Sequence, residues 1–251
     1  MDLRNCTKQE LSQMPYEYVC EAYYQHNPNA VWILGVFFRH GKNGAPQNYE
    51  KARQLLEIAY EYEGAGSGFI LGNIYEEGLG TTVDLKKAED YYCAFSEETH
   101  DPTGYSAAAF LYLKNENLPN RDEKIPEYLK KSEALGGCPL SDTLIGQLYI
   151  AGTPDFPKDI NKAVFYLERS KNYKILGDLF SDEKNIEPNY KLASYYYELG
   201  MSDNMDCCAK YAFLNLYYGS INESWTNVPK GISVAKKYLK TNNNCLLYTS
   251  D

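Results

Sequence analysis

The feature that most constrains this chain is a short pattern that returns at a nearly fixed spacing. A small residue follows an apolar residue directly, and a further apolar residue and an aromatic residue stand two and three positions after it. Aligned on the small residue, or on the residue that replaces it, the pattern occurs at Gly35, Gly72, Ala109, Gly146, Gly177 and Leu214. By subtraction the steps are 37, 37, 37, 31 and 37 residues. A fixed period of this size is typical of a solenoid built from repeated supersecondary units.

The same pattern predicts a helix at each anchor. Offsets −1, +2 and +3 from the anchor share one face of a helix, and this face is apolar in every copy. A glycine inside a helix costs about 1 kcal/mol relative to alanine. Its recurrence therefore indicates a position where a second helix approaches too closely for a side chain. Leu214 lacks this feature, so we expect the sixth unit to pack more loosely.

A second helix is expected after each of these helices. Its anchors precede an apolar or aromatic pair, and they are Ala52, Ala88, Ile125, Ala163, Ala193 and Ala235. The residues four positions before the anchors are expected N-caps, and they are Asn48, Asp84, Asp159 and Asn189. Side-chain oxygens of Asn and Asp accept hydrogen bonds from free amides at a helix start. In the third unit Arg121 holds this place.

The segment from Gly72 to Tyr92 combines Tyr75, Gly78, Gly80, Asp84, Lys87 and Ala88 in a pattern that Gly146 to Tyr166 nearly repeats. This pattern resembles the Sel1-like repeat family, whose members are related to tetratricopeptide repeats. The resemblance covers roughly Ala30 to Leu239. It implies an all-α fold, a right-handed α/α superhelix, or solenoid, of about six helix-turn-helix repeats. It implies a shape and not a reaction, since function depends on sites that are specific to each protein.

We expect residues 1–28 to form an N-terminal capping helix segment and residues 29–240 to form the solenoid. The expected repeats are about 29–66, 67–101, 102–137, 138–171, 172–202 and 206–240. In the cap, Thr7 and Glu10 fit a capping box, and Ser12 is the expected N-cap of a helix from about Pro15 to Gln25. The last helix is expected to end at Thr241. Residues 241–251 are expected to be a disordered or artefactual tail, because CLLYTSD resembles translated adapter sequence.

Composition narrows the classes of function. The formal net charge of −9 argues against a nucleic-acid partner, which requires a basic surface. No apolar run is long enough to span a membrane and no secretory signal is visible, so we expect a cytoplasmic protein without a membrane partner. The seven cysteines recur with no repeat spacing and favour reduced thiols. None of the three histidines has a partner at metal spacing, so we expect no metal and no cofactor.

The remaining candidate site is a surface. Offsets −3, +1 and +4 on the first helices share a face away from the apolar stripe, and in related helical repeats this face lines the concave side. The candidate partner-binding residues are Trp32, Arg39, Phe69, Asn73, Glu76, Phe110, Gln147, Lys174, Tyr211 and Asn215. Aromatic anchors flanked by amides suit an extended peptide or a helix. The alternative is that Trp32, Phe69 and Phe110 pack between neighbouring repeats.

The sequence thus predicts a non-enzymatic scaffold or adaptor that binds a peptide or protein partner on the concave face. One alternative is an exported bacterial effector or host-interaction protein that uses the same surface. A hydrolase is less favoured, because no nucleophile and base stand together in a known pattern. Acidic pairs such as Glu76-Glu77 are explained more simply as solvated helix ends.

Overall fold

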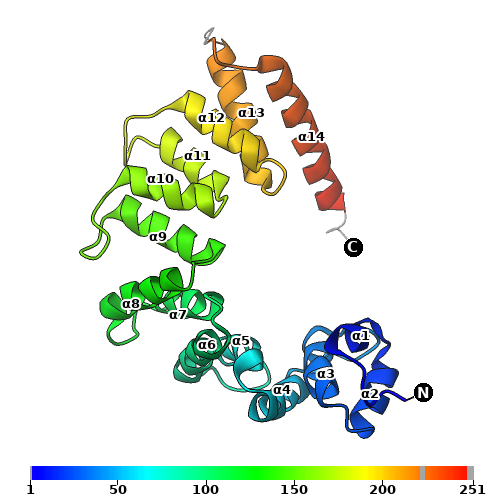
Figure 1. Cartoon of the computed structure of the whole chain (residues 1–251). Coiled ribbons are helices and arrows are strands. Elements are labelled where there is room, and N and C mark those ends of the chain that lie inside the picture. Colours follow the sequence, from blue (N-terminus) through cyan, green and yellow to red (C-terminus); the bar gives the residue numbers. More distant parts are fainter. Residues whose placement is uncertain (1, 221–223, 248–251) are drawn as a thin grey trace. The chain divides into compact units, whose positions relative to one another are not determined.

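The computed structural model describes residues 2–220 and 224–247. Of residue 63 and residues 241–247 it describes the backbone only. Every regular element in this part of the chain is helical (Figure 1). The elements are α1 (Lys8–Gln13), α2 (Tyr16–Tyr24), α3 (Pro28–His40), α4 (Tyr49–Glu63), the 3₁₀ turn η1 (Ala65–Ser67), α5 (Gly68–Glu77), α6 (Leu85–Thr99), α7 (Thr103–Lys114), α8 (Arg121–Ala134), α9 (Pro139–Ala151), α10 (Ile160–Arg169), α11 (Tyr173–Ser181), α12 (Tyr190–Gly200), α13 (Met205–Ser220) and α14 (Val228–Leu247). The expected all-α architecture of helix-turn-helix units is confirmed.

The helices group into two compact units, residues 1–141 and residues 142–251. We call α3, α5, α7, α9, α11 and α13 the first helices, and α4, α6, α8, α10, α12 and α14 the second helices. None of the described helices is long and apolar enough to cross a membrane.

The starts of four second helices follow from the residues that precede them. The side chains of Asn48, Asp84, Asp159 and Asn189 accept hydrogen bonds from the amide three residues later, at 2.9 to 3.0 Å, which confirms the predicted N-caps. The backbone amide of each cap also donates to the carbonyl of the aromatic residue that ends the apolar stripe of its first helix, at 2.7 to 3.0 Å. In the third unit the Arg121 guanidinium donates to the Tyr112 carbonyl instead, at 3.0 Å. The loop between the helices is therefore anchored at both ends.

The glycine anchors lie where a second helix approaches closely. A Cβ atom on Gly35 or Gly146 would lie 2.7 Å from the Cγ of Leu56 or Leu167. On Gly72 and Gly177 it would lie 2.4 and 2.3 Å from the Cε1 of Tyr92 and Tyr197. Real Cβ atoms do not come this close to other atoms, so these four helix pairs can pack as they do only because glycine has no side chain. The third anchor, Ala109, is fully buried.

In the sixth repeat the register of the helices differs from the predicted one. Asn227 caps its second helix by accepting from the Lys230 amide at 3.1 Å, so Gly231 is the equivalent of Ala52. Gly231 is buried, and the predicted anchor Ala235 is only half-buried. On α13 the buried stripe is Tyr211, Leu214 and Asn215, which is centred on Ala212 and not on Leu214. A Cβ atom on Gly231 would lie 3.2 Å from the Asn215 Cβ atom and 3.7 Å from the Ala212 carbonyl oxygen, so α14 packs tightly on α13 here. The expected looser packing rested on the wrong anchor.

The N-terminal segment packs on the first repeat. Leu3, Leu11, Val19 and Ala22 are fully buried in one cluster with Ala30 of α3. The capping box of Thr7 and Glu10 is confirmed. Ser12 is not an N-cap, because Pro15 precedes α2 and the Ser12 hydroxyl donates to the Gln9 carbonyl at 2.7 Å. At the other end, α14 does not stop at Thr241 and continues to Leu247, while residues 248–251 lie outside the described part.

Candidate partner-binding surface on the first helices

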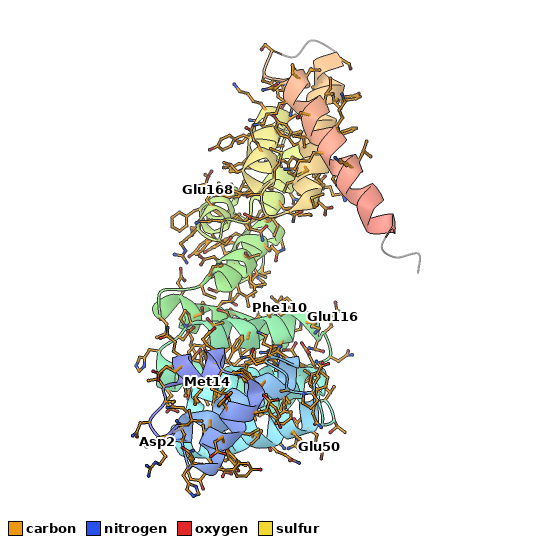
Figure 2. The ribbon with its side chains drawn as sticks, turned by 90° about the vertical axis from the view of Figure 1, so that its right-hand side faces the viewer. Asp2, Met14, Glu50, Phe110, Glu116 and Glu168 are labelled. Carbon is orange, nitrogen blue, oxygen red and sulfur yellow. The ribbon has the colours of Figure 1, made fainter. Side chains whose placement is uncertain are left out.

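In unit 1 the predicted surface residues differ in how far they are exposed. Phe110, labelled on α7 in Figure 2, is 43 % exposed. Trp32, Arg39, Phe69, Asn73 and Glu76 are half-buried. The Phe69 ring lies 5.6 Å from that of Tyr92 and 5.7 Å from that of Phe95, and the Lys8 ammonium lies 5.3 Å from the Trp32 ring. Trp32 and Phe69 thus contribute to packing, and Phe110 has the largest exposed fraction of the three aromatic side chains.

Two polar residues of this surface in unit 1, Glu76 and Asn73, form hydrogen bonds within the protein. The Glu76 carboxylate accepts hydrogen bonds from the Tyr92 hydroxyl at 2.8 Å and from the Lys114 ammonium at 3.4 Å. The Asn73 amide donates to the Phe69 carbonyl at 2.7 Å. Burial raises the pKa of Tyr92, and the adjacent Glu76 carboxylate raises it further, so its hydroxyl stays a hydrogen-bond donor. The Tyr92 ring occupies the space that a side chain at position 72 would need.

The fifth repeat of the chain, which lies in unit 2, has the same arrangement. Tyr197 packs on Gly177, and its hydroxyl donates to Asp178 at 2.7 Å. Lys174, a predicted surface residue, pairs with the same carboxylate at 2.9 Å, and Lys210 of α13 also binds it. Burial alone would raise the pKa of Asp178, but the hydrogen bonds from Lys210, Lys174 and Tyr197 outweigh it and lower the pKa. The carboxylate is therefore ionised and fully engaged.

Two predicted surface residues, Tyr211 and Asn215, are each only 1 % exposed and cannot contact a partner. The Asn215 amide donates to the Ser194 hydroxyl at 2.8 Å and to the Tyr211 carbonyl at 2.9 Å. Its oxygen accepts from the Asn227 amide at 2.7 Å. Both residues were misplaced because the register of α13 is shifted by two positions. The spacing between Asn227 and Gly231, which matches that between Asn48 and Ala52, is the sequence signal that was missed.

With the corrected register, the same position of the first helix is exposed in three repeats. The residue directly after the small anchor is Phe110 in the third unit, Gln147 in the fourth and Phe213 in the sixth. All three are exposed, Phe213 to 63 %. Phe213 also stacks on Tyr217, with ring centroids 5.7 Å apart at 13°.

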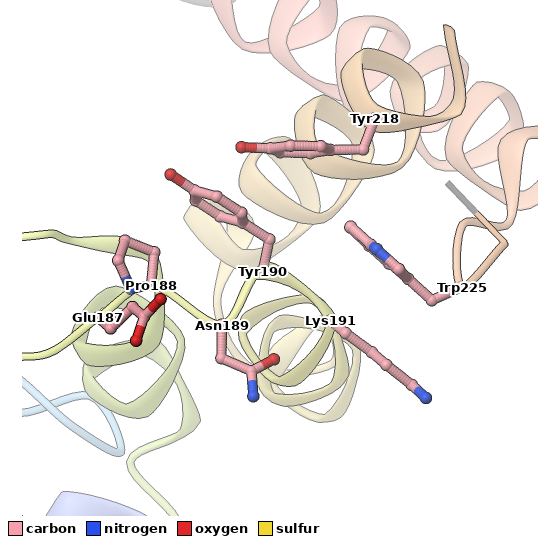
Figure 3. A pocket seen from close by; sticks show the side chains of 7 residues that line it. All are labelled: Glu187, Pro188, Asn189, Tyr190, Lys191, Tyr218 and Trp225. Atoms are coloured by element: carbon pink, nitrogen blue, oxygen red, sulfur yellow. The ribbon is translucent and has the colours of Figure 1, made fainter. Parts of the chain in front are cut away.

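Phe213 lies on the edge of a hollow between α11, α12 and α13. Its lining includes Ser181, Tyr197, Lys210, Phe213 and Tyr217. A second hollow shares Tyr190 and Tyr218 with the first and is lined by Glu187, Pro188, Asn189, Tyr190, Lys191, Tyr218 and Trp225 (Figure 3). The rings of Tyr190 and Tyr218 are stacked with centroids 4.6 Å apart, and Trp225 lies beside them at 5.6 Å from Tyr218. Together the hollows form an aromatic surface on unit 2.

The described side chains contain no group of three or more His, Cys, Asp or Glu residues that could hold a metal ion. The six described cysteines are free thiols, and burial raises the pKa of Cys93 and of Cys207 to about 11. Thiols with such values are poor nucleophiles near neutral pH.

Comparisons with known proteins identify the repeats. The Sel1 repeat family model matches residues 28–61, 69–100, 140–172 and 176–201, which fall in the first, second, fourth and fifth units. A search of curated proteins found no match.

Two solved structures share the fold. The crystal structure of a Sel1 repeat protein from Oxalobacter formigenes is 17% identical, covers 95% of this chain and 100% of its own, and superposes with a TM-score of 0.71. That of a protective antigen with an SLR fold, present in uropathogenic Escherichia coli strains, is 18% identical with a TM-score of 0.64. The match covers 93% of this chain and 49% of the antigen, so the chain spans about half of that protein. The repeat matches and the shared fold agree with the resemblance seen in the sequence, and the chain belongs to the Sel1-repeat family.

Proposed function

We propose that this protein is a non-enzymatic interaction scaffold that binds a peptide or protein partner on the exposed faces of its first helices. The observation that carries this proposal is that Phe110 and Phe213 occupy the same helix position and are 43 % and 63 % exposed. Covering apolar surface gains about 25 cal/mol per Å². Aromatic side chains of this kind are frequent energetic anchors of interfaces. Sel1 repeats generally serve protein–protein contacts, which supports the same function.

The polar neighbours support a division of roles. Glu76 and Asp178 are held by Tyr92 and Tyr197, so they maintain the shape of the surface. In this proposal Phe110 and Phe213 supply the apolar contacts, and the exposed Gln147 supplies hydrogen bonds to a partner backbone. The stacked Tyr217 presents a rigid second ring beside Phe213.

The test compares affinity capture by tagged wild type with that by the Phe110→Asp/Phe213→Asp double variant, using lysate of the source cells. The matched control is Phe165→Asp, because Phe165 is 57 % exposed but lies on the second helix α10. We expect a partner that wild type and the control retain and that the double variant loses by about tenfold or more. Circular dichroism must show native helicity in all three proteins.

Equal recovery of every captured protein by the double variant would contradict the proposal and move the site away from the first helices. Loss of the partner in the Phe165 control alone would assign binding to the second helices.

A further inference from the structure

The second helix of the sixth repeat, α14, carries two exposed apolar side chains. Ile232 is 42 % exposed and Leu239 is 59 % exposed. They stand five and twelve residues after the N-cap Asn227, so they share one side of the helix, about 10 Å apart along its axis. We call these places positions five and twelve of a second helix. α13 packs beside α14 (Figure 1), and the described part of the chain has no helix after α14.

In the second repeat, the first helix of the next repeat covers both positions of α6. Glu89 at position five is 5 % exposed and accepts a hydrogen bond from the Tyr112 hydroxyl of α7 at 3.1 Å. Ser96 at position twelve is 1 % exposed, and its hydroxyl oxygen accepts a hydrogen bond from the Tyr105 amide of α7 at 2.9 Å.

The fifth repeat shows the same cover. Ser194 at position five of α12 is 6 % exposed, and its hydroxyl accepts a hydrogen bond from the side-chain amide of Asn215 of α13 at 2.8 Å. Met201 at position twelve is half-buried and packs in one cluster with Cys207 and Tyr211 of α13. In both repeats a helix therefore covers these positions, and the equivalent place on α14 is exposed.

The polar residues beside the two apolar side chains of α14 are basic. Lys236 and Lys240 are exposed, and helix periodicity places them on the same side as Ile232 and Leu239. α14 contains four lysines and no acidic residue, a formal charge of +4, in a chain whose net charge is −9. One of the four, Lys230, is paired with a carboxylate of α12, and α13 adds one aspartate and one lysine. We call the following residues the outer face of α14: Ile232, Lys236, Leu239 and Lys240.

We propose that the outer face of α14 binds an acidic amphipathic helix of a partner protein, which lies on α14 as α7 lies on α6. The apolar stripe of that helix would cover Ile232 and Leu239. Its glutamates or aspartates would pair with Lys236 and Lys240, which are about one helical turn apart. This inference goes beyond the proposed function, because the face belongs to a second helix and contains none of the residues proposed above to bind a partner.

Two other occupants fit this face less well. Two copies of the chain that met through their outer faces would bring their lysines together, and like charges disfavour such a contact. A helix that lies in a membrane surface buries a broad apolar face. Of the described side chains of α14, only Ile232 and Leu239 are large, apolar and exposed, and Gly231 on another side of the helix packs against α13.

The probes for the test are two helical peptides of about 18 residues with the same leucine stripe, one with glutamate and one with lysine on its polar face. Fluorescence anisotropy measures the binding of each labelled peptide to the whole chain at low and at high salt. We expect the glutamate peptide to bind and the lysine peptide to fail. Ile232→Ser/Leu239→Ser is expected to weaken binding by about tenfold or more. Lys236→Gln/Lys240→Gln is expected to weaken it less and to reduce its salt dependence.

Matched controls remove similar side chains elsewhere. Phe110→Ser/Phe213→Ser removes two exposed apolar side chains from the first helices. Lys158→Gln/Lys184→Gln removes two exposed lysines from unit 2. Both variants should bind the glutamate peptide as wild type does, and the first of them keeps this inference independent of the proposed function. Circular dichroism must show native helicity in every variant.

Four results would overturn the inference. Unchanged binding by Ile232→Ser/Leu239→Ser, or weakened binding by either control, would place the peptide away from the outer face. Equal binding of the lysine peptide would remove the role of charge. Binding of wild type, but not of Lys236→Gln/Lys240→Gln, to phosphatidylserine vesicles would identify a membrane as the occupant. A lower sedimentation coefficient of Ile232→Ser/Leu239→Ser than of wild type, without peptide, would identify a second copy.

Discussion

At the scale of single residues, glycine and tyrosine are matched across two of the helix pairs, α5 with α6 and α11 with α12. Gly72 and Gly177 face the rings of Tyr92 and Tyr197, and a carboxylate on the same first helix receives each hydroxyl. We expect Gly72→Ala to lower the free energy of unfolding by about 1–2 kcal/mol, because overpacking at the fully buried Tyr92 ring exceeds the gain in helix propensity. Urea denaturation followed by circular dichroism measures the change.

The control for this substitution is Gly66→Ala, since a Cβ atom on Gly66 meets no atom within 4 Å. It should change stability by less than about 0.5 kcal/mol. A Gly72→Ala variant as stable as wild type would show that the Tyr92 ring can move aside.

At the scale of elements, Glu89 joins three helices. This carboxylate on α6 is 5 % exposed and accepts hydrogen bonds from Tyr112 of α7 at 3.1 Å, from Lys86 at 3.2 Å and from Tyr128 of α8. Burial alone would raise its pKa, but the bonds from Tyr128, Lys86 and Tyr112 outweigh burial and lower it. A lowered pKa means that ionised Glu89 stabilises the fold above the unfolded pKa of about 4.3, and that this stabilisation is lost as pH falls through the folded value.

We therefore expect Glu89→Gln to cost about 1–3 kcal/mol at pH 7, because the hydroxyls of Tyr112 and Tyr128 lose a charged acceptor. The difference from wild type should shrink as pH falls below the unfolded pKa. Urea denaturation at a series of pH values tests both statements, with the exposed Glu116→Gln as the control. A difference that is the same at every pH would show that the charge of Glu89 does not stabilise the packing.

At the scale of the whole molecule, each repeat of such a fold contacts its neighbours, and stability is approximately a sum of local terms. Residues 1–141 and residues 142–251 form two compact units. We expect Gly177→Ala, whose Cβ atom would lie 2.3 Å from Tyr197, to speed amide hydrogen exchange in α11, α12 and α13. Exchange in α3 to α6 should stay at the wild-type rate. Equal acceleration in both units, measured by mass spectrometry, would indicate one cooperative structure instead.

The first, second, fourth and fifth repeats each contain their own local signals, a glycine anchor and a capping side chain, and the structure confirms these caps. The caps Asn48 and Asp84 and the glycines Gly35 and Gly72 are close in sequence to the helices that they define. The prediction was wrong at α13, where Leu214 keeps the 37-residue step and the apolar flanking residues but not the small anchor. There Gly231 packs against α13, with the Asn215 Cβ atom as its nearest neighbour, and Asn227 caps α14.

By itself, the sequence determined the all-helical fold, the caps of four second helices and the pairing of first with second helices in most repeats, because these depend on periodicity and on contacts between residues near in the chain. Only the tertiary structure decided which surface residues remain accessible. It buried Tyr211 and Asn215, engaged Glu76 and Asp178 with tyrosine hydroxyls, and left Phe110 and Phe213 exposed. The physical reason is that burial and hydrogen bonding are set by neighbours from other helices, which no local pattern specifies.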